Sequence, residues 1–298
     1  MSSLDEIRSI REKKLELLKS KGFDPYPAKT NREISLVEAI SNFEDLEKSG
    51  ETKWLAGRIL SIRGQGAIIF VTLYDGTANF QGLIKKDILG DEAFNLFNDA
   101  IDIGDFVELH GIFFTTKRGE KSIETREWRI LSKTLLPLPE KWHGLTDDDE
   151  RYRKRYLDIL MNPELLVMFE KKAKFWDVTR NFMKEHGFIE VETPTLEVTT
   201  GGAEANPFKT HHDDFDIDVY LRISIGELWQ KRLMSAGFPK TFEIGRAYRN
   251  EGSSPEHLQE FTNMEFYWAY ANYEDGMKLT EELYKKIANE VFGTTKFT

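Results

Sequence analysis

The chain has 298 residues, of which 40% are hydrophobic, 31% charged and 12% aromatic, and none is cysteine. The lack of cysteine excludes a disulfide framework and a thiolate metal site, and no apolar run approaches the length that spans a membrane. The net charge of −10 argues against a general nucleic-acid binder, because phosphate neutralisation requires Lys and Arg, although a local basic patch is compatible with it. The first six residues, Met1 to Glu6, have no apolar signal-peptide core. We therefore expect a cytoplasmic protein of two domains that does not enter a membrane.

The N-terminal part predicts a helical arm followed by a β-barrel. Residues 4–21 have the spacing of an amphipathic, modestly basic helix within a segment over residues 1–50. A solvated helix face explains its basic residues, and an arm that touches RNA phosphates is the alternative. Five runs rich in β-formers then follow, separated by Gly, Asp or charged turns. They favour an OB-type barrel over residues 51–136, a fold used for single-stranded nucleic acid. The runs are 54–62, 68–73, 78–84, 106–115 and 122–130.

Four residues of this barrel are candidates for contacts with RNA bases. Arg63, Phe70 and Gln81 would supply a cation, a stacking platform and a base-edge hydrogen bond. Glu120, in the Gly119-Glu120-Lys121 turn, would add an acceptor. A buried core position is the competing interpretation of Phe70, and spacing alone favours it because Phe is often buried.

The most informative stretch is residues 241–270, in which two alternating runs flank a polar loop over residues 250–259. This pattern predicts a β-hairpin with a long tip. One face of its second strand has a plausible core composition, and the other face places a carboxylate between aromatic side chains. The core face has Thr262, Met264, Phe266 and Trp268, and the other has Phe261, Asn263, Glu265 and Tyr267.

The hairpin resembles motif two of the class II aminoacyl-tRNA synthetases. Its first strand ends in Tyr248-Arg249-Asn250-Glu251, and its second begins with Glu260-Phe261-Thr262. A helix over residues 163–186 and the segment Gly187 to Pro194 resemble motif one, which in the family forms the dimer interface. The junction Pro137 to Glu164 closely resembles that of lysyl-tRNA synthetases, and its Trp142-His143-Gly144 is expected to be structural. The resemblance implies an α+β fold: the barrel, a linker over residues 137–162 and a partial class II antiparallel sheet flanked by helices over residues 163–298.

The resemblance implies ATP-dependent activation of lysine and its transfer to tRNA(Lys) by a homodimer. Arg249 would be the catalytic residue and would hold the α-phosphate, Glu251 the adenine amino group, Phe261 the adenine ring and His257 the outer phosphates. The family usually has Arg-His in this loop, whereas this chain has Glu256-His257. In the barrel, Arg63, Phe70, Gln81 and Glu120 would bind the anticodon.

A buried ammonium requires a carboxylate partner, which selects Glu265, flanked by Tyr267, and then Glu227. Glu227 follows Ser224 at the spacing of a helix capping box, so a cap is the alternative to a substrate contact. The family has one residue fewer before this glutamate. Gly202 lies in a loop whose backbone is free to approach a ligand, and a simple turn is the alternative.

The motifs also limit the activity that is expected of the chain. The adjacent His211 and His212 would point to opposite faces of a strand, so no metal site is expected within the chain. Mg2+ is expected with ATP, its ligands lying mostly in a C-terminal part beyond residue 298. A Gly-rich motif three with its arginine does not occur, so we expect an incomplete form with little lysine-dependent ATP–pyrophosphate exchange. The alternatives are a non-catalytic tRNA-binding or regulatory protein, and a relative that acts on aspartate or asparagine.

Overall fold

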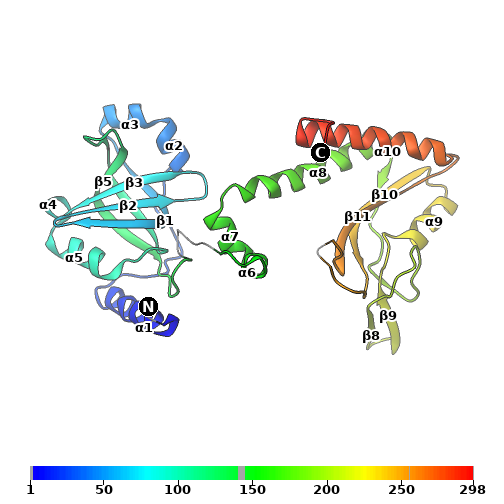
Figure 1. Ribbon diagram of the computed structural model, residues 1–298, viewed down its shortest axis with the longest axis horizontal. Helices are drawn as coiled ribbons and strands as arrows, with labels where there is room; N and C mark the ends of the chain where they lie inside the picture. The colour runs from blue at the N-terminus through cyan, green and yellow to red at the C-terminus, as the bar shows by residue number, and fades with distance from the viewer. Residues whose placement is uncertain (1–2, 140–144, 255, 298) are drawn as a thin grey trace. The chain divides into compact units, whose positions relative to one another are not determined.

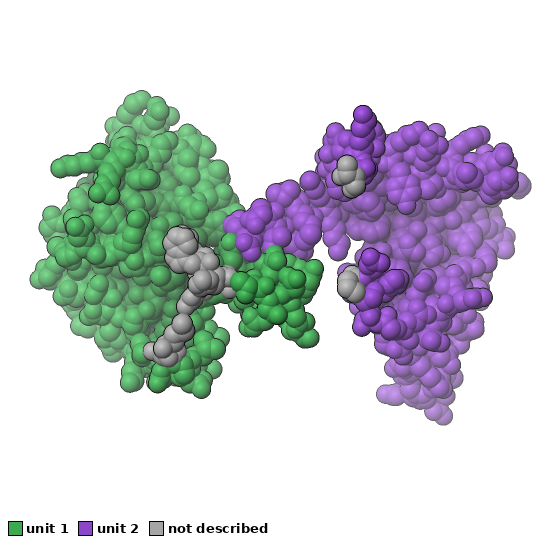
Figure 2. Space-filling model, in the orientation of Figure 1, with its two compact units in different colours: residues 1–161 green, residues 162–298 purple. Residues whose placement is uncertain are grey.

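The computed structural model describes residues 3–139, 145–254 and 256–297, and the chain divides into two compact units (Figures 1 and 2). Unit 1 spans residues 1–161 and unit 2 spans residues 162–298. Each unit has a buried apolar cluster of its own. The predicted structural role of Trp142-His143-Gly144 concerns a segment outside the described residues.

Five strands of unit 1 close into a barrel with the order β1-β2-β3-β5-β4, in which only β3 and β5 pair in parallel. Alternating apolar side chains fill its interior, and Ile59, Leu73 and Leu109 are completely buried. The predicted OB-type barrel and α+β fold class are confirmed. The strands are β1 (Thr52–Gln65), β2 (Ile68–Tyr74), β3 (Asn79–Lys85), β4 (Phe106–Thr115) and β5 (Lys121–Ser132).

The helices before and between these strands share the core of the barrel. Leu18, Leu36 and Phe43 belong to the same buried cluster as the barrel interior, so the N-terminal segment packs on the barrel. Two helices between β3 and β4 are not predicted by the sequence analysis, and one of them packs Phe97 edge-on against Trp128 at 5.1 Å between ring centres. These helices are α1 (Leu4–Ser20), α2 (Leu36–Ser41), α3 (Phe43–Ser49), α4 (Lys86–Leu89) and α5 (Asp91–Ala100). After the barrel, unit 1 ends with α6 (Asp148–Arg153) and α7 (Arg155–Met161).

Unit 2 contains two three-stranded sheets and three α-helices among its described residues. The first sheet has the order β11-β10-β6 and the second β7-β9-β8. The last helix continues into a π-helical segment that ends at Gly293, whose φ of +71° suits glycine. The elements are α8 (Leu165–Glu185), β6 (Ile189–Glu190), β7 (Leu196–Glu197), β8 (Lys209–His212), β9 (Ile217–Leu221), α9 (Glu227–Ser235), β10 (Lys240–Tyr248), β11 (Glu260–Trp268), α10 (Tyr273–Ile287) and η1 (Ala288–Phe292).

The predicted hairpin is formed by β10 and β11, which pair antiparallel without a bulge from Lys240 opposite Trp268 to Tyr248 opposite Glu260. Met264, Phe266 and Trp268 pack against a core that α8 and α10 supply, so the predicted core face is confirmed. The register places Glu243, Gly245 and Ala247 of β10 on the other face, opposite the polar and aromatic residues of β11. On that second face Glu243 and Ala247 are buried, whereas the side chains of β11 remain partly exposed.

Candidate functional site

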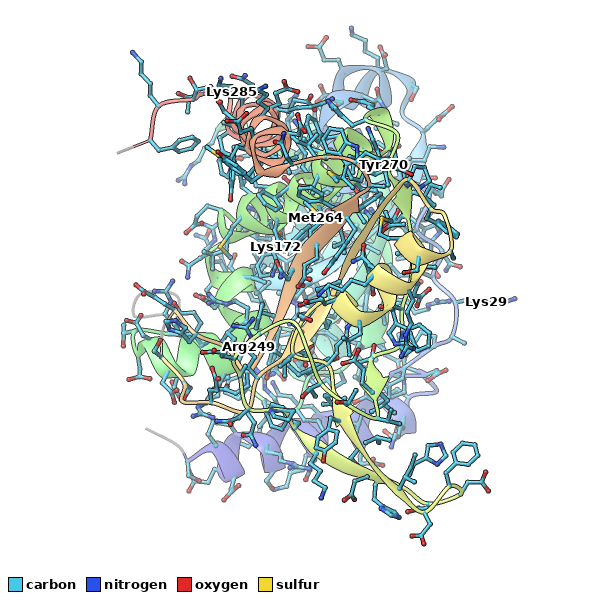
Figure 3. The ribbon with its side chains drawn as sticks, turned by 90° about the vertical axis from the view of Figure 1, so that its right-hand side faces the viewer. Lys29, Lys172, Arg249, Met264, Tyr270 and Lys285 are labelled. Atoms are coloured by element: carbon cyan, nitrogen blue, oxygen red, sulfur yellow. The ribbon has the colours of Figure 1, made fainter. Side chains whose placement is uncertain are left out.

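The candidate site in unit 2 is built on the second face of the hairpin, by residues at its open end and along β11. Figure 3 shows Arg249 at one end of the hairpin, Tyr270 at the other and Met264 between them on β11. The loops over residues 201–203 and 222–226 and the start of α9 complete this face through contacts with Glu265 and Glu227. Three segments distant in sequence therefore meet there.

Arg249 is held by its backbone and by one side-chain hydrogen bond. Its backbone N–H donates to the Gln259 carbonyl at 2.8 Å, and its Nε donates to the Ile223 carbonyl at 3.3 Å. Its guanidinium carbon lies 5.2 Å from the ring centre of Phe261, in cation–π range. The two Nη atoms have no hydrogen-bond partner among the described residues, so a planar pair of donors is left for an anion.

The loop that joins the strands contains the two other residues predicted to bind ATP. Glu251 accepts a hydrogen bond from the Asn206 backbone N–H at 3.3 Å, and its own carbonyl accepts from the Gln259 amide at 3.2 Å. The His257 Nδ1 lies 2.8 Å from the Ser254 hydroxyl oxygen, and both residues are exposed. The two predicted residues therefore lie in the same loop as Arg249, His257 nearer its exposed tip.

The four residues predicted to bind lysine lie close to one another. Glu265 accepts a hydrogen bond from the Ile225 backbone N–H at 2.9 Å. Burial raises the pKa of Tyr267 to about 12, and the neighbouring carboxylates of Glu227 and Glu265 add to the shift. Gly202 has a φ of +93°, and a Cβ there would lie 2.2 Å from a carboxylate oxygen of Glu227, so only glycine permits this close approach. Two acidic side chains, a neutral phenol and a glycine backbone thus lie near one another.

The capping-box interpretation of Ser224 and Glu227 is wrong. The residue that precedes α9 is Gly226, with a φ of +63° and no side-chain cap, and Glu227 is the first helical residue. The Ser224 hydroxyl instead donates to the Gly201 carbonyl at 2.7 Å. The serine is therefore bonded to the loop before it and not to the helix end, and Glu227 forms an ion pair with Lys231 at 2.5 Å.

A buried ion pair beside the site, on the same face of the hairpin, is not predicted by the sequence analysis. Arg222 donates from Nη1 to Glu243 at 2.6 Å, and both side chains are almost fully buried. The Thr193 hydroxyl donates to the second oxygen of Glu243 at 2.6 Å. A Cβ at Gly245 would lie 2.2 Å from the Arg222 guanidinium, so this glycine provides space for the arginine. The ion pair holds β10 in place, where Glu243 lies directly opposite Glu265 of β11.

No group of three or more His, Cys, Asp or Glu that could hold a metal ion occurs among the described residues. His211 pairs with Asp216 and Asp218 at 3.4 Å each, whereas the His212 ring lies 4.7 Å from that of Phe215. The two histidines therefore have different neighbours.

A second candidate site is a groove on the barrel of unit 1, of about 1120 Å³, to which all four predicted base-binding residues contribute. The register pairs Arg63 with Phe70, and Gln81 lies two rows away on the same face. Phe70 is half-exposed and is not part of the buried core, so the core interpretation of Phe70 is wrong. Basic residues and a second aromatic that the sequence analysis missed also line the groove: Lys85, Phe114, Lys117, Arg118 and Lys121.

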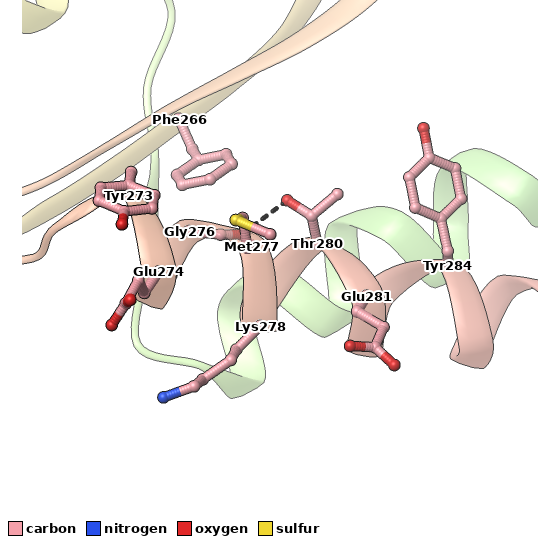
Figure 4. A pocket seen from close by; sticks show the side chains of 9 residues that line it. All are labelled: Phe266, Tyr273, Glu274, Gly276, Met277, Lys278, Thr280, Glu281 and Tyr284. Atoms are coloured by element: carbon pink, nitrogen blue, oxygen red, sulfur yellow. Dashed lines mark hydrogen bonds between the residues drawn. The ribbon is translucent and has the colours of Figure 1, made fainter.

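A further hollow lies on the opposite face of the hairpin, between Phe266 and the outer side of α10 (Figure 4). Tyr273, Met277 and Tyr284 are largely exposed along this helix. The one hydrogen bond drawn there joins the Thr280 hydroxyl to the Gly276 carbonyl at 2.8 Å, within the helix itself. This hollow has no polar groups directed at a common point and is separate from the Glu265 face.

Comparison with known proteins identifies the class. Residues 147–298 match the family of tRNA synthetases class II (D, K and N), and residues 53–131 match the OB-fold nucleic acid binding domain. The chain therefore belongs to the class II tRNA synthetases. No helix among the described residues is long and apolar enough to cross a membrane.

Within this class, the chain is similar to lysine–tRNA ligases. That of Pelotomaculum thermopropionicum is 45% identical over 293 residues, which cover 98% of this chain and 57% of the relative. That of Thermotoga maritima is 45% identical, with coverages of 99% and 59%, and that of Halalkalibacterium halodurans is 42% identical, with coverages of 99% and 60%. The chain thus spans 57–60% of the length of these relatives.

Proposed function

We propose that this chain provides the tRNA-binding and adenylate-forming residues of a lysine–tRNA ligase. The observation that supports this most directly is the arrangement of the hairpin. Phe261 and Glu265 share one face of β11, and the guanidinium of Arg249 lies over the Phe261 ring. A phosphate-binding cation, an adenine platform and an ammonium-binding carboxylate therefore project from one rigid element.

In the proposed reaction, the lysine carboxylate attacks the α-phosphorus of ATP, a P–O bond forms, and pyrophosphate leaves with the electrons of the broken bond. The free Nη donors of Arg249 bind the α-phosphate oxygens, where negative charge must be stabilised. Phe261 stacks on adenine, Glu251 accepts from its amino group, and His257 contacts the outer phosphates. The ribose hydroxyl of tRNA(Lys) then attacks the carbonyl carbon and displaces AMP.

Mg2+ is proposed to accompany ATP in this reaction. A magnesium ion bound to a nucleotide needs one or two protein carboxylates in addition to phosphate oxygens. The described residues contain no group of three or more His, Asp or Glu side chains that could hold a metal ion. We therefore assign no residue of this chain to the ion.

Lysine selectivity is proposed to come from Glu265, with Glu227 as a second carboxylate. An ammonium group leaves water only where a carboxylate and further acceptors replace its hydration. Tyr267 stays neutral at physiological pH, because its pKa is about 12, and so adds a phenol oxygen without a second charge. Gly202 lets the loop backbone close against the same position. An aspartate side chain would meet two carboxylates there and be repelled.

The groove of unit 1 is proposed to bind the anticodon of tRNA(Lys). Phe70 offers a ring face for stacking, while Arg63, Gln81 and Glu120 offer polar groups for base edges. The lysines and arginine at the groove concentrate positive charge locally on a chain whose net charge is −10.

We further propose that the protein is a cytoplasmic homodimer. The first turns of α8, which follow the junction and precede the motif-one segment, expose Leu166, Val167, Met168 and Phe169 by 37–51%. Exposed apolar side chains around one helical turn favour a protein partner. Light scattering of the purified chain would measure its mass directly.

Isothermal titration of the 298-residue chain tests the proposed function without requiring turnover. We expect lysine to bind and aspartate and asparagine not to bind at the same concentrations. We also expect an RNA hairpin with the tRNA(Lys) anticodon loop to bind. Binding of aspartate or asparagine in place of lysine would move the protein to another branch of the family. RNA binding with no affinity for lysine or ATP would instead support a non-catalytic RNA-binding role.

A further inference from the structure

One row of side chains crosses four strands of the barrel at the floor of the groove in unit 1. The strand register pairs Ser61 with Thr72, Thr72 with Gln81, and Gln81 with Ser122. The first pair is closed by a hydroxyl–hydroxyl hydrogen bond of 2.8 Å. The last pair of the row, Gln81 with Ser122, determines which end of the Gln81 amide faces the groove.

Ser122 has its single proton committed to the backbone. Its side chain is completely buried, and its hydroxyl donates to the Glu120 carbonyl at 3.2 Å. A carbonyl can only accept, so the lone pairs of the Ser122 oxygen are left for another donor. The Gln81 Nε2 occupies that position and donates at 2.8 Å. The direction of both hydrogen bonds is therefore set by the Glu120 carbonyl, in the turn that precedes β5.

This chain of hydrogen bonds fixes the orientation of the Gln81 amide. Because Nε2 faces Ser122, the carbonyl oxygen Oε1 is the other end of the amide, and it has no partner among the described residues. Gln81 lines the groove together with Phe70, whose ring would stack a base. The Glu120 carbonyl also accepts from the Thr116 backbone N–H at 2.9 Å, which ties the turn that presents Glu120 to the same serine.

We propose that Ser122 is a positioning residue for base selection, which holds the Gln81 carbonyl toward the RNA so that this position accepts the ring imino N–H of a base. A uracil or guanine imino group meets that requirement, and a ring nitrogen with a lone pair does not. The inference rests on the proposed RNA-binding function of the groove. Without Ser122, the amide is free to rotate and to offer either its oxygen or its NH2 group, and the selection against acceptor bases is lost.

The test measures discrimination between two RNA ligands and not affinity alone. The 298-residue chain is titrated by fluorescence anisotropy with a hairpin that has the tRNA(Lys) anticodon loop. A second set of hairpins replaces one anticodon uridine at a time with the 2-pyrimidinone ribonucleoside, which has a lone pair at N3 in place of N–H. For the unsubstituted protein we expect at least tenfold weaker binding at one position, the value of one good base contact.

Ser122→Ala is expected to reduce that difference to less than threefold, while the salt dependence of binding stays unchanged. Thr125→Val is the matched control, because Thr125 is a buried hydroxyl of the same strand whose oxygen has no partner among the described residues. It should keep the discrimination of the unsubstituted protein. Ser122→Cys, which retains a weak donor and acceptor, should be intermediate and serves if the alanine variant does not fold.

The outcomes separate this inference from the proposed function. Hairpin binding with undiminished discrimination in Ser122→Ala, or with none in the unsubstituted protein, overturns the role of Ser122 and leaves RNA binding intact. Failure of the unsubstituted protein to bind any hairpin overturns the RNA-binding function, and the inference with it.

Discussion

Replacement of Arg249 by lysine tests the phosphate-binding half of the hairpin site. Arg249 donates one side-chain hydrogen bond within the described residues, from Nε to Ile223, and its two Nη atoms remain available. Lysine would keep the charge and lose the planar pair of donors. Hydrogen bonds to charged groups contribute about 1.5–3 kcal/mol each. Since lysine still offers one donor, we expect the loss of one such bond, which weakens ATP binding by roughly 10–100-fold.

The assay is titration of ATP into both proteins, with urea unfolding as a check on stability. Arg246→Lys is the control, because Arg246 lies on β10, the strand that leads to Arg249, is 55% exposed and faces Glu260 at 3.5 Å. It should leave ATP affinity unchanged, since an exposed ion pair contributes little. Equal ATP affinity in Arg249→Lys and the unsubstituted protein, with unfolding unaffected, would refute the assignment of Arg249 to the phosphate.

Three further predictions concern the groups around the site. Gly245→Ala should lower the free energy of unfolding in urea by about 3 kcal/mol, because the new Cβ would lie 2.2 Å from the buried Arg222 side chain. Gly276→Ala, in open space on α10, should raise it by about 0.5–1 kcal/mol. Equal effects of the two substitutions would contradict the close contact between Gly245 and Arg222. In an alkaline absorbance titration, Tyr267→Phe should remove a phenol that ionises near pH 12. Because the pKa of Tyr267 is higher in the folded than in the unfolded state, folding is favoured less as pH rises from 10 to 12. The free energy of unfolding should therefore fall more steeply over this range in the unsubstituted protein than in the variant. Burial raises the pKa of Glu197, so the contribution of its protonated carboxyl to stability is present at low pH and is lost as pH rises. Glu197→Gln should therefore unfold at a higher urea concentration than the unsubstituted protein at pH 7, and this difference should vanish towards pH 3. A difference that stays constant with pH would exclude titration of Glu197 as its cause.

The regular elements follow from the sequence because their side-chain periods are local. Alternation along residues 241–270 predicts both strands of the hairpin and which face is buried, and the turn residues between the barrel runs locate all five strands. Helix α5 could also have been predicted from the sequence, because Phe94, Phe97 and Ala100 recur at three-residue spacing after Gly90.

The supporting contacts of the site are not local and so were not predictable. Arg222 and Glu243 are 21 residues apart, and only the fold brings their charges to 2.6 Å. Phe70 could have faced either side of its strand, because an aromatic side chain suits a core and a stacking platform equally. The Ser224-x-x-Glu227 spacing is compatible with a cap, but Gly226 adopts a positive φ immediately before the helix, and Glu227 is the first helical residue.

The central claim is that Glu265 selects an ammonium beside an adenylate bound by Arg249 and Phe261. Its most direct measurement is a cycle of two proteins and two ligands by isothermal titration. The unsubstituted chain and Glu265→Gln are each titrated with a sulfamoyl analogue of lysyl-adenylate and with the norleucyl analogue, in which a hydrogen atom replaces the ammonium. We predict that the unsubstituted chain prefers the lysyl ligand by at least about tenfold, as for one charged hydrogen bond, and that Glu265→Gln loses that preference. The same preference in both proteins would contradict the account.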